Sequence, residues 1–478
     1  MMQRSTGVTP AARQLVRPRR GTSRTGLTSI RIVAMTPRRE NGHVMRSLSR
    51  KKSTYVLGIT LSALALSSCS GGTAGPSGET SSSGATVQTS GPLTMWTRAS
   101  TASQSKALVD AWNAANDRKV ELTVVPNDNY LQKVGVAAGS NELPCIMSSD
   151  VVYMPNFIKK NLYIDITDRV KGLAFADALA PGHMKLSSVD GKIYGVPHNV
   201  AVSAIFQNDV LLKRAGIDPT KKLGSLEELA ANAAKVSALG DNIAGLYYTG
   251  NNAGSISFTH FPAIWASGGE AISEDGTKSL LNSDKAVAVF KIFNEMFKSG
   301  ASPDSVRNES GATRNEVFGT GKVGYVMASN SVLQSVPETD TLKIGVQGIP
   351  GVGGGVSSYV GGDAIGITTS CHDAAGAWQF LSWTLSEEAQ VGVFAKMNQL
   401  TVRSDLAQNK YAQADPRMVR LNELVGLGDT PKALNYGQTF NDPNGPALSA
   451  FREALFGSDA KAALDAANAA ISSSLAGS

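Results

Sequence analysis

The chain has 478 residues, 42% of them apolar, and this length can bury a sizeable core in roughly two or three domains. The formal net charge of +6 comes from the first 68 residues, which hold 13 Lys and Arg against one acid, Glu40, and leave 32 basic and 38 acidic residues in the remainder. The basic charge therefore belongs to the N-terminal segment, and we expect no nucleic-acid partner.

That segment has the layout of an export signal. Basic residues at 46 and 50–52 precede an uncharged stretch at 55–66, which is shorter than the ~20 residues of a membrane-spanning helix. Met45 lies where such a signal normally starts. We therefore interpret residues 45–68 as a signal peptide and residues 1–44 as a disordered extension or a misassigned start.

A cysteine follows the apolar stretch directly. Leu66-Ser67-Ser68-Cys69 resembles the bacterial lipobox, in which the cysteine is diacylated and becomes the mature N-terminus. A buried free thiol is the alternative interpretation of Cys69. Residues 69–91 are rich in Gly, Ser and Thr and carry one charge, Glu79, which is typical of a flexible tether.

Alternating strand and helix patterns come next. We predict a strand at 93–97, a helix at 105–116, a strand at 120–124, a helix at 130–138 and a strand at 145–150. This βαβαβ order indicates a parallel sheet with right-handed crossovers.

The later patterns continue in the same style. Asp190-Gly191 predicts a hairpin-like turn before a strand at 194–196, and the Gly-rich stretch 348–355 predicts a flexible loop. Further strands are predicted at 323–327 and 364–368, and helices at 227–239, 285–297, around Trp378, at 446–456 and at 458–475, the last with Ser458 as N-cap. No internal repeat is visible.

Several segments carry a resemblance through their order. They are MWTRAS, SSDVVYMPNFIKKNLYIDITD, GKIYGVPHNVAVSAIFQNDVLLKRAGID, GKVGYVMASNSVLQ, VGGDAIGITTS with AAGAWQFLSWTLSEEAQ, and LTVRSD. In this order the chain from about Leu93 onward resembles the extracellular solute-binding proteins of ABC importers, in the family 1 or maltose-binding-like branch. The family often has Gly-Ser-Trp where this chain has Ala328-Ser329-Asn330, which removes a possible sugar-stacking Trp.

The resemblance implies an α/β, periplasmic-binding-protein-like (type II) fold, with two α/β lobes, a hinge and an interlobe ligand cleft. Lobe 1 would comprise residues 92–199 and 362–403, and lobe 2 residues 200–361 and 404–478. The chain would cross between lobes near residues 198–201, 359–363 and 402–405.

It also implies a function without catalysis or cofactor. The protein would be a lipid-anchored, monomeric substrate-binding protein on the extracytoplasmic face of the cell membrane. It would capture a carbohydrate or related polyol and deliver it to ABC permease subunits by hinge closure, with a diacylglycerol at Cys69 as the anchor.

Candidate ligand contacts follow from the chemistry of sugars, which present hydroxyl rims and apolar faces to polar groups and flat rings. Open α/β sheets place ligands at the carboxyl ends of their strands. The candidates are Trp96, Thr97, Arg98, Ser100, Asp150, Tyr153, Asn199, Phe258, His260, Trp265, Asn330, Ser331, Gly361, Gly362 and Asp363. Structural alternatives exist, because Arg98 could pair with an acid, Asp150 could cap a helix, and Trp265 could lie in the core.

The sequence selects no catalytic or metal site, because it lacks HExxH, paired CxxC, GxSxG and a P-loop lysine. A surface-anchored carbohydrate-active enzyme would need two carboxylates ~5 to 9.5 Å apart, for which position nominates only Asp150 and Asp363. A ligand-sensing partner of a membrane kinase is a further alternative. Cys145 and Cys371 could form a disulfide or remain two buried thiols.

Overall fold

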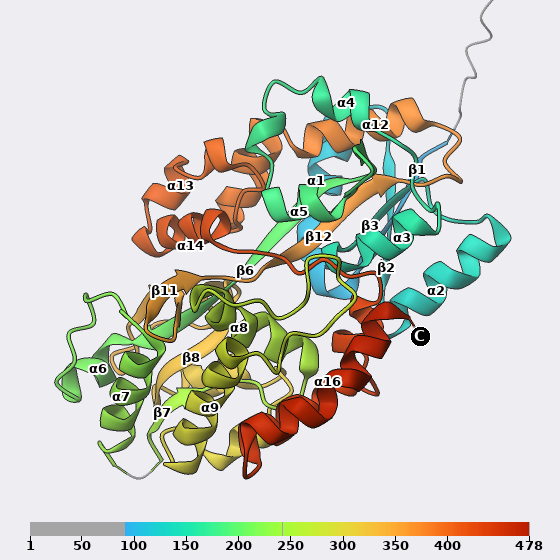
Figure 1. Ribbon diagram of the computed structural model, residues 1–478. Helices are drawn as coiled ribbons and strands as arrows, with labels where there is room; N and C mark the ends of the chain where they lie inside the picture. The colour runs from blue at the N-terminus through green and yellow to red at the C-terminus, as the bar shows by residue number, and fades with distance from the viewer. Residues whose placement is uncertain (1–90, 241, 478) are drawn as a thin grey trace, which may run out of the picture. The chain divides into compact units, whose positions relative to one another are not determined.

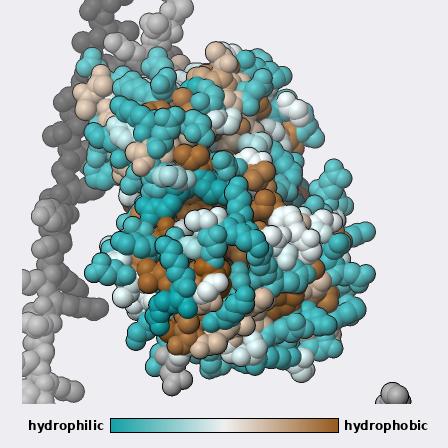
Figure 2. Space-filling model, turned by 90° about the vertical axis from the view of Figure 1, so that its left-hand side faces the viewer, coloured by the Kyte–Doolittle hydropathy of each residue, from teal (hydrophilic) through white to brown (hydrophobic). Residues whose placement is uncertain are grey.

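The computed structural model describes residues 91–240 and 242–477, which belong to one unit, Gly84–Ser478. The predicted extension, signal peptide, Cys69 and nearly all of the predicted tether lie outside the described residues. Among the helices of the described part, none combines the length and apolar character that crossing a membrane requires. On the face shown in Figure 2, hydrophilic residues surround small hydrophobic areas.

A parallel three-stranded arrangement begins the fold. β1 (Leu93–Arg98) pairs in parallel with β2 (Val120–Val125) and with β3 (Ile146–Asp150). The side chains of Leu93, Met95 and Thr97 are buried in alternation along β1, as a strand covered on one face requires. The predicted βαβαβ unit is confirmed, with α1 (Ala102–Ala115) and α2 (Asn127–Ser140) as its helices.

One long strand, β6, runs from this part of the sheet into the other part, and β12 lies beside its first half (Figure 1). β12 (Val360–Ile367) pairs antiparallel with β3 and with the first half of β6 (Val196–Asn208). The second half of β6 pairs with β8 (Val323–Ser329) and β9 (Ile344–Gln347), and β7 (Ala244–Tyr247) pairs with β8. We call the β1–β3 side the first half and the β7–β9 side the second half.

Short hairpins accompany the main sheet. β4 (Ser188–Val189) and β5 (Lys192–Ile193) flank the predicted turn, where Asp190 and Gly191 both have positive φ. The prediction of a flexible loop at 348–355 is wrong, because β10 (Ile349–Gly351) and β11 (Gly354–Ser357) form a hairpin there. The strand predicted at 194–196 is also corrected, because β6 begins at Val196 and continues for 13 residues.

Helices cover both halves. Besides α1 and α2, the first half has α3 (Met154–Lys159), α4 (Thr167–Lys171), α5 (Pro181–Leu186) and α12 (Ala374–Thr384). The second half has α6 (Asp209–Arg214), α7 (Leu226–Ser237), α8 (Ala253–Ala266), α9 (Asp284–Lys298), α10 (Arg314–Gly319), α11 (Val332–Ser335), α15 (Pro446–Phe456) and α16 (Ala460–Ala476). The N-cap of α16 is Asp459, not the predicted Ser458, because the Asp459 carboxylate accepts from the Lys461 and Ala462 amides.

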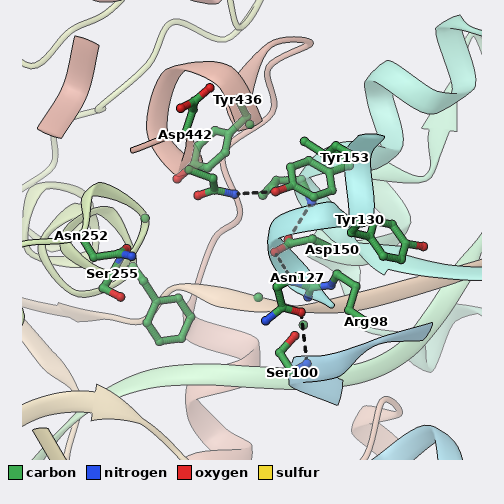
Figure 3. A pocket seen from close by; sticks show the side chains of 18 of the residues that line it. Arg98, Ser100, Asn127, Tyr130, Asp150, Tyr153, Asn252, Ser255, Tyr436 and Asp442 are labelled. Atoms are coloured by element: carbon green, nitrogen blue, oxygen red, sulfur yellow. Dashed lines mark hydrogen bonds and ion pairs between the residues drawn. The ribbon is translucent and has the colours of Figure 1, made fainter. Parts of the chain in front are cut away.

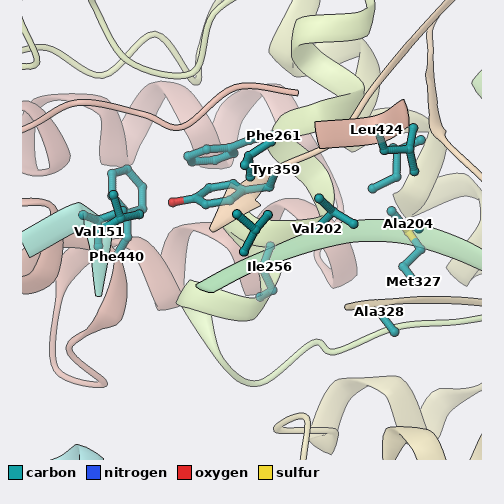
Figure 4. Packing of buried hydrophobic residues seen from close by; sticks show 14 of the residues in the cluster. Val151, Val202, Ala204, Ile256, Phe261, Met327, Ala328, Tyr359, Leu424 and Phe440 are labelled. Carbon is teal, nitrogen blue, oxygen red and sulfur yellow. The ribbon is translucent and has the colours of Figure 1, made fainter. Parts of the chain in front are cut away.

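The core continues through the crossing strands (Figure 4). Val202 and Ala204 of β6 pack among buried side chains of α8 and β8. α13 (Lys410–Gln413) precedes α14 (Pro416–Leu427), whose Leu424 is buried and which packs against β6 and β9. Both faces of β6 are covered by packed side chains, and this packing holds the strand in place where it passes from one half to the other.

A third segment runs beside the crossing strands at residues 428–430. The Val360 amide donates to the Asp429 carbonyl (2.9 Å), and the Thr430 hydroxyl donates to the Val360 carbonyl (2.5 Å). Val402, where a crossing was predicted, instead accepts from the Ala180 amide of the first half (2.9 Å). These contacts favour residues 428–430 as the third connection, and the lobe bounds remain predictions.

Candidate functional site

A cavity of about 750 Å³ lies where the carboxyl ends of β1 and β3 meet the first turn of α8, the start of β12 and a C-terminal segment. That segment includes η8 (Gly437–Asn441), a single π-helical turn. Side chains from both halves therefore face one space. Its position at the ends of parallel strands is the one that open α/β sheets use for ligands.

Arg98 occupies one side of the cavity between two aspartates. Its Nη1 lies 3.2 Å from Asp150 Oδ2, its Nε donates to Asp363 Oδ1 at 3.1 Å, and its Nη2 also pairs with Asp363. Asp363 is fully buried and also accepts from the Thr101 (2.9 Å) and Ser148 (3.0 Å) hydroxyls. Two carboxylates thus hold the Arg98 guanidinium in place.

The charges in this cluster shift one another's pKa values. Burial alone would lower the pKa of Arg98, but the negative charges of Asp363 and Asp150 raise it. Burial favours the neutral form of Asp363, yet the charge and hydrogen bonds of Arg98 hold its pKa below the ordinary value. Burial dominates at Asp150 and raises its pKa, although Arg98 opposes the shift.

Aromatic rings form a second part of the wall. Phe258 of α8 and Tyr359 both line the cavity, with ring centroids 5.1 Å apart, and Tyr153 and Tyr436 line it as well. Burial raises the pKa values of Tyr153 and Tyr436, so their hydroxyls stay protonated as hydrogen-bond donors. Flat rings with polar edges suit the mixed surface of a sugar.

Amide and hydroxyl side chains complete the wall (Figure 3). Asn127 Oδ1 accepts from the Ser100 amide at 3.2 Å on the side of the first half. Asn441 donates through Nδ2 to the Tyr153 hydroxyl at 3.4 Å, and so connects the C-terminal segment with the first half. Neutral donors and acceptors of this kind are the partners that ligand hydroxyls need.

Seven of the fifteen predicted ligand contacts line this cavity. They are Arg98, Ser100, Asp150, Tyr153, Phe258, Gly361 and Gly362. The structural alternatives stated for two of them also hold, because Arg98 is paired with acids and Asp150 caps the short turn η2 (Val151–Tyr153) by accepting from the Val152 amide.

Eight predicted contacts do not line it. In the first half, the Thr97 hydroxyl bonds to the Ser105 hydroxyl (2.7 Å), and Lys133 Nζ lies 4.3 Å from the centre of the Trp96 ring. Asn199 Oδ1 accepts from the Asp363 amide (3.3 Å), and Asp363 lies behind Arg98 without exposure. These four side chains are therefore held by contacts within the first half and by the cluster of Arg98 with Asp150 and Asp363, which we call the Arg98 cluster.

The other four lie in the second half. His260 is fully buried, with its ring centre 4.3 Å from that of Phe293, and burial lowers its pKa to about 3. The Trp265 ring packs against the Tyr359 ring, with the ring centroids 5.8 Å apart and the planes tilted by 36°. Asn330 Oδ1 accepts from the Val202 amide (3.0 Å), and the Ser331 hydroxyl bonds to that of Ser329 (2.7 Å), which does line the cavity.

The other residues that line the cavity were not among the predicted contacts. They are Asn127, Tyr130, Leu131, Val152, Asn252, Gly254, Ser255, Arg314, Ser329, Tyr359, Tyr436, Gly437, Gln438, Asn441, Asp442 and Pro443. Asn252 is the N-cap of α8, with Oδ1 accepting from the Ser255 amide at 2.8 Å, so a cap pattern could have located it. The residues at 436–443 reach the cavity by tertiary packing alone.

Cys145 and Cys371 are joined by a disulfide with their Cα atoms 4.1 Å apart, and neither lines the cavity. Within residues 91–240 and 242–477, no group of three or more His, Cys, Asp or Glu side chains could hold a metal ion. The features of the site are therefore those of a polar and aromatic binding cavity.

Comparison with known proteins identifies the family. The model of the bacterial extracellular solute-binding protein family matches residues 107–419. A binding protein of Brucella abortus (strain 2308) is 27% identical over 301 residues, covering 61% of this chain and 70% of that protein. The sn-glycerol-3-phosphate-binding periplasmic protein of Yersinia pestis is 25% identical over 258 residues, covering 49% and 55% respectively.

A solved structure shares the fold. The cyclic alpha-maltosyl-1,6-maltose binding protein of Arthrobacter globiformis superposes with a TM-score of 0.69 and 21% identity, covering 81% of this chain and 100% of that one. The predicted type II periplasmic-binding-protein-like fold class is thereby confirmed. The family match spans more than half of the sequence, and this chain belongs to the bacterial extracellular solute-binding proteins.

Proposed function

We propose that this protein is the lipid-anchored substrate-binding protein of an ABC importer, and that it captures a carbohydrate or related polyol outside the cell. The cavity carries this proposal, because it places aromatic rings and neutral polar groups around one space. Such a wall can contact both the apolar faces and the hydroxyl rim of a sugar. Two of the similar proteins are named for ligands of these kinds, a maltosyl-maltose sugar and sn-glycerol 3-phosphate, the phosphate ester of a polyol.

Delivery to a permease would depend on hinge closure. β6 pairs with strands of both halves, and β12 begins beside the point where β6 passes between them, so small backbone rotations near Val202 and Gly362 would move one half against the other. The Asn441–Tyr153 hydrogen bond is a contact between the C-terminal segment and the first half beside the cavity. A ligand that touches both sides gains contacts in the closed form and favours it.

Cys69 would provide the anchor. Two acyl chains give stable membrane attachment where a single chain gives only marginal binding. We expect C69S to abolish labelling of the protein with radioactive palmitate and to release it from washed membranes. Unchanged labelling and retention of C69S would contradict the anchor while leaving ligand capture untouched.

Ligand capture is tested by thermal unfolding of the purified full chain in the presence of carbohydrates. The panel contains monosaccharides, disaccharides, oligosaccharides, polyols and glycerophosphodiesters. A ligand that binds only the folded state at 100 times its Kd adds about 2.7 kcal/mol to the free energy of unfolding and raises Tm. No shift with any compound would contradict the substrate class, and chemical turnover of one would favour a carbohydrate-active enzyme.

A further inference from the structure

Two arginines line the cavity, and their charges are compensated differently. Arg98 has two carboxylates within ion-pair distance. Arg314, the first residue of α10, is only 9% exposed and has no carboxylate within 4.0 Å among the described residues. Its Nη1 donates to the Thr249 hydroxyl at 3.2 Å, while its Nε is buried without a hydrogen-bond partner.

The acid that acts on Arg314 is Glu309, and its oxygens are already occupied. They accept from the Gly311 amide (2.6 Å), from the Thr313 hydroxyl (2.6 Å) and amide (3.3 Å), and from the Tyr247 hydroxyl (3.3 Å). Burial lowers the pKa of Arg314, and the charge of Glu309 opposes this shift only in part. A buried guanidinium with an unpaired N–H is costly unless another anion approaches it.

The neighbours of Arg314 are also suited to an anion. The hydroxyls of Ser255 and Thr249 both lie near Gly311, because a Cβ atom built on Gly311 would be 3.6 Å from Ser255 Oγ and 3.7 Å from Thr249 Oγ1. Thr249 is the residue to which Arg314 donates, so the Ser255 hydroxyl lies close to the Arg314 contact. Gly254 and Ser255 belong to the first turn of α8, a helix of 14 residues, and both line the cavity. A helix N-terminus carries partial positive charge. The Ser255 amide already donates to Asn252 Oδ1 at 2.8 Å, so it is this partial charge and the Ser255 hydroxyl that the first turn offers to an anion.

The acids of the cavity lie elsewhere. Figure 3 shows Asn252 and Ser255 on the side of the cavity opposite Arg98 and Asp150. Asp150 is paired with Arg98, and Asp442 is an exposed side chain that accepts from the Asn444 amide at 2.8 Å. Among the described residues, the charge of Arg314 is therefore compensated only in part, by Glu309, which lies beyond ion-pair distance.

We propose that Arg314 and the first turn of α8 bind a negatively charged group of the ligand, so that the captured solute is an anionic carbohydrate or polyol. The group is a carboxylate or a phosphate, either of which can take two N–H donors from one guanidinium. This inference rests on the proposed function, because it specifies the chemical class of the captured solute. Arg98, the other arginine of the cavity, is excluded from this role by its two aspartates.

The test is calorimetric titration of the purified full chain with pairs of ligands that differ in one charged group. One pair is a disaccharide ending in glucuronate against the same disaccharide ending in glucose. The other is glycerol 3-phosphate against glycerol, so the two pairs separate a carboxylate from a phosphate. We expect the charged member of at least one pair to bind about tenfold or more tighter, with an affinity that falls as salt rises.

Variants locate the charge that is responsible. R314Q should remove the preference for the charged member, so that the two members of a pair bind with similar affinity, and R314K should keep part of the preference. R420Q is the matched control, because Arg420 pairs with Glu423 on α14 and does not line the cavity. If R314Q does not fold, R314K and the salt dependence of the wild-type protein still decide the question.

Each other outcome contradicts a specific claim. Equal binding of charged and neutral members overturns the anion site and leaves sugar capture standing. A charge preference that survives in R314Q overturns the assignment to Arg314. Absence of binding by every member of both pairs counts against the anion site, and it counts against the proposed function as well if the wider carbohydrate panel also gives no thermal shift.

Discussion

At the scale of single residues, the Arg98 cluster has the largest energetic consequence. Asp363 has no exposed side-chain surface and Asp150 is only 23% exposed, so neither carboxylate can be solvated fully by water. Removing one partner of a buried ion pair leaves an uncompensated charge, which costs about 3–5 kcal/mol. An exposed pair contributes at most ~1 kcal/mol.

R98A should therefore lower the free energy of unfolding by about 3–5 kcal/mol, measured by urea denaturation. The control is K106A, because Lys106 pairs with Asp110 on the surface with both side chains at least 60% exposed. We expect K106A to change stability by less than about 1 kcal/mol. Equal effects of the two substitutions would show that the Arg98 cluster is not a buried charge network.

Three buried histidines predict how stability depends on pH. Burial lowers the pKa of His183 and of His198 to about 4 and that of His260 to about 3, although the nearby charge of Asp363 opposes the shift at the first two. In the unfolded chain these imidazoles take up protons as the pH falls below about 6.5, whereas in the folded protein they stay neutral until a much lower pH. Stability contributed by the neutral histidines is therefore present above pH 6.5 and is lost as the pH falls towards 4.

We expect Tm to fall steadily between pH 6.5 and pH 4, and H260F to fall less steeply because it removes one of the three groups. Phenylalanine suits the site, since His260 lies among Tyr248, Phe290 and Phe293. H372Q, at an exposed position, is the control. A slope that is the same in H260F as in the wild-type protein would contradict this account.

At the scale of elements, the crossing of β6 and β12 depends on one glycine. Gly362 has a φ of +114°, and a Cβ atom there would overlap the Asn199 carbonyl of the neighbouring strand. Gly361 has no such φ, and the atom nearest to an added Cβ is Phe258 Cε2 at 3.3 Å. The two adjacent glycines thus differ in strain while sharing the same cavity.

G362A should lower the free energy of unfolding by about 1–3 kcal/mol, and G361A should lower it by less. Both variants are compared by urea denaturation under the same conditions. The reverse order would contradict the geometry at the crossing.

The disulfide connects the start of β3 with the segment before α12 across 226 residues of sequence. Peptide mapping without reduction should find the Cys145 and Cys371 peptides linked. Reduction, or the substitution C371S, should lower the free energy of unfolding by about 2–4 kcal/mol. Two alkylated thiols in the untreated protein would contradict the bond.

The elements that could be predicted from the sequence are those with local signals. The βαβαβ unit follows from apolar periodicity, and the β4–β5 turn follows from Asp190-Gly191. The β10–β11 hairpin could not be predicted, because its glycines matter through tertiary contact. A Cβ on Gly351 or Gly355 would overlap the backbone of Ala266 in α8, and nothing local indicates that approach.

The candidate site divides in the same way. Arg98, Ser100, Asp150 and Tyr153 follow predicted strands, so a rule about strand ends located them. Asn441 comes from a segment that packs against the cavity from the far end of the chain. Arg314 is buried with few partners, a property visible only in three dimensions.

At the scale of the described unit, β6, β12 and residues 428–430 lie side by side where the chain passes between the two halves. The cavity lies beside them and takes its wall from both halves. A ligand bound there would join the halves, and this arrangement connects capture with hinge closure in the proposed function.

Whether this cavity binds the carbohydrate is tested most directly by calorimetric titration of the purified full chain with the compound that gives the largest thermal shift. We predict one binding site per chain and an affinity that falls by about tenfold or more in F258A, because Phe258 lines the cavity. F175A is the control, since Phe175 is half-buried beside Arg403 and does not line the cavity. Binding that is unchanged in F258A but weakened in F175A, or no binding at all, would contradict the account.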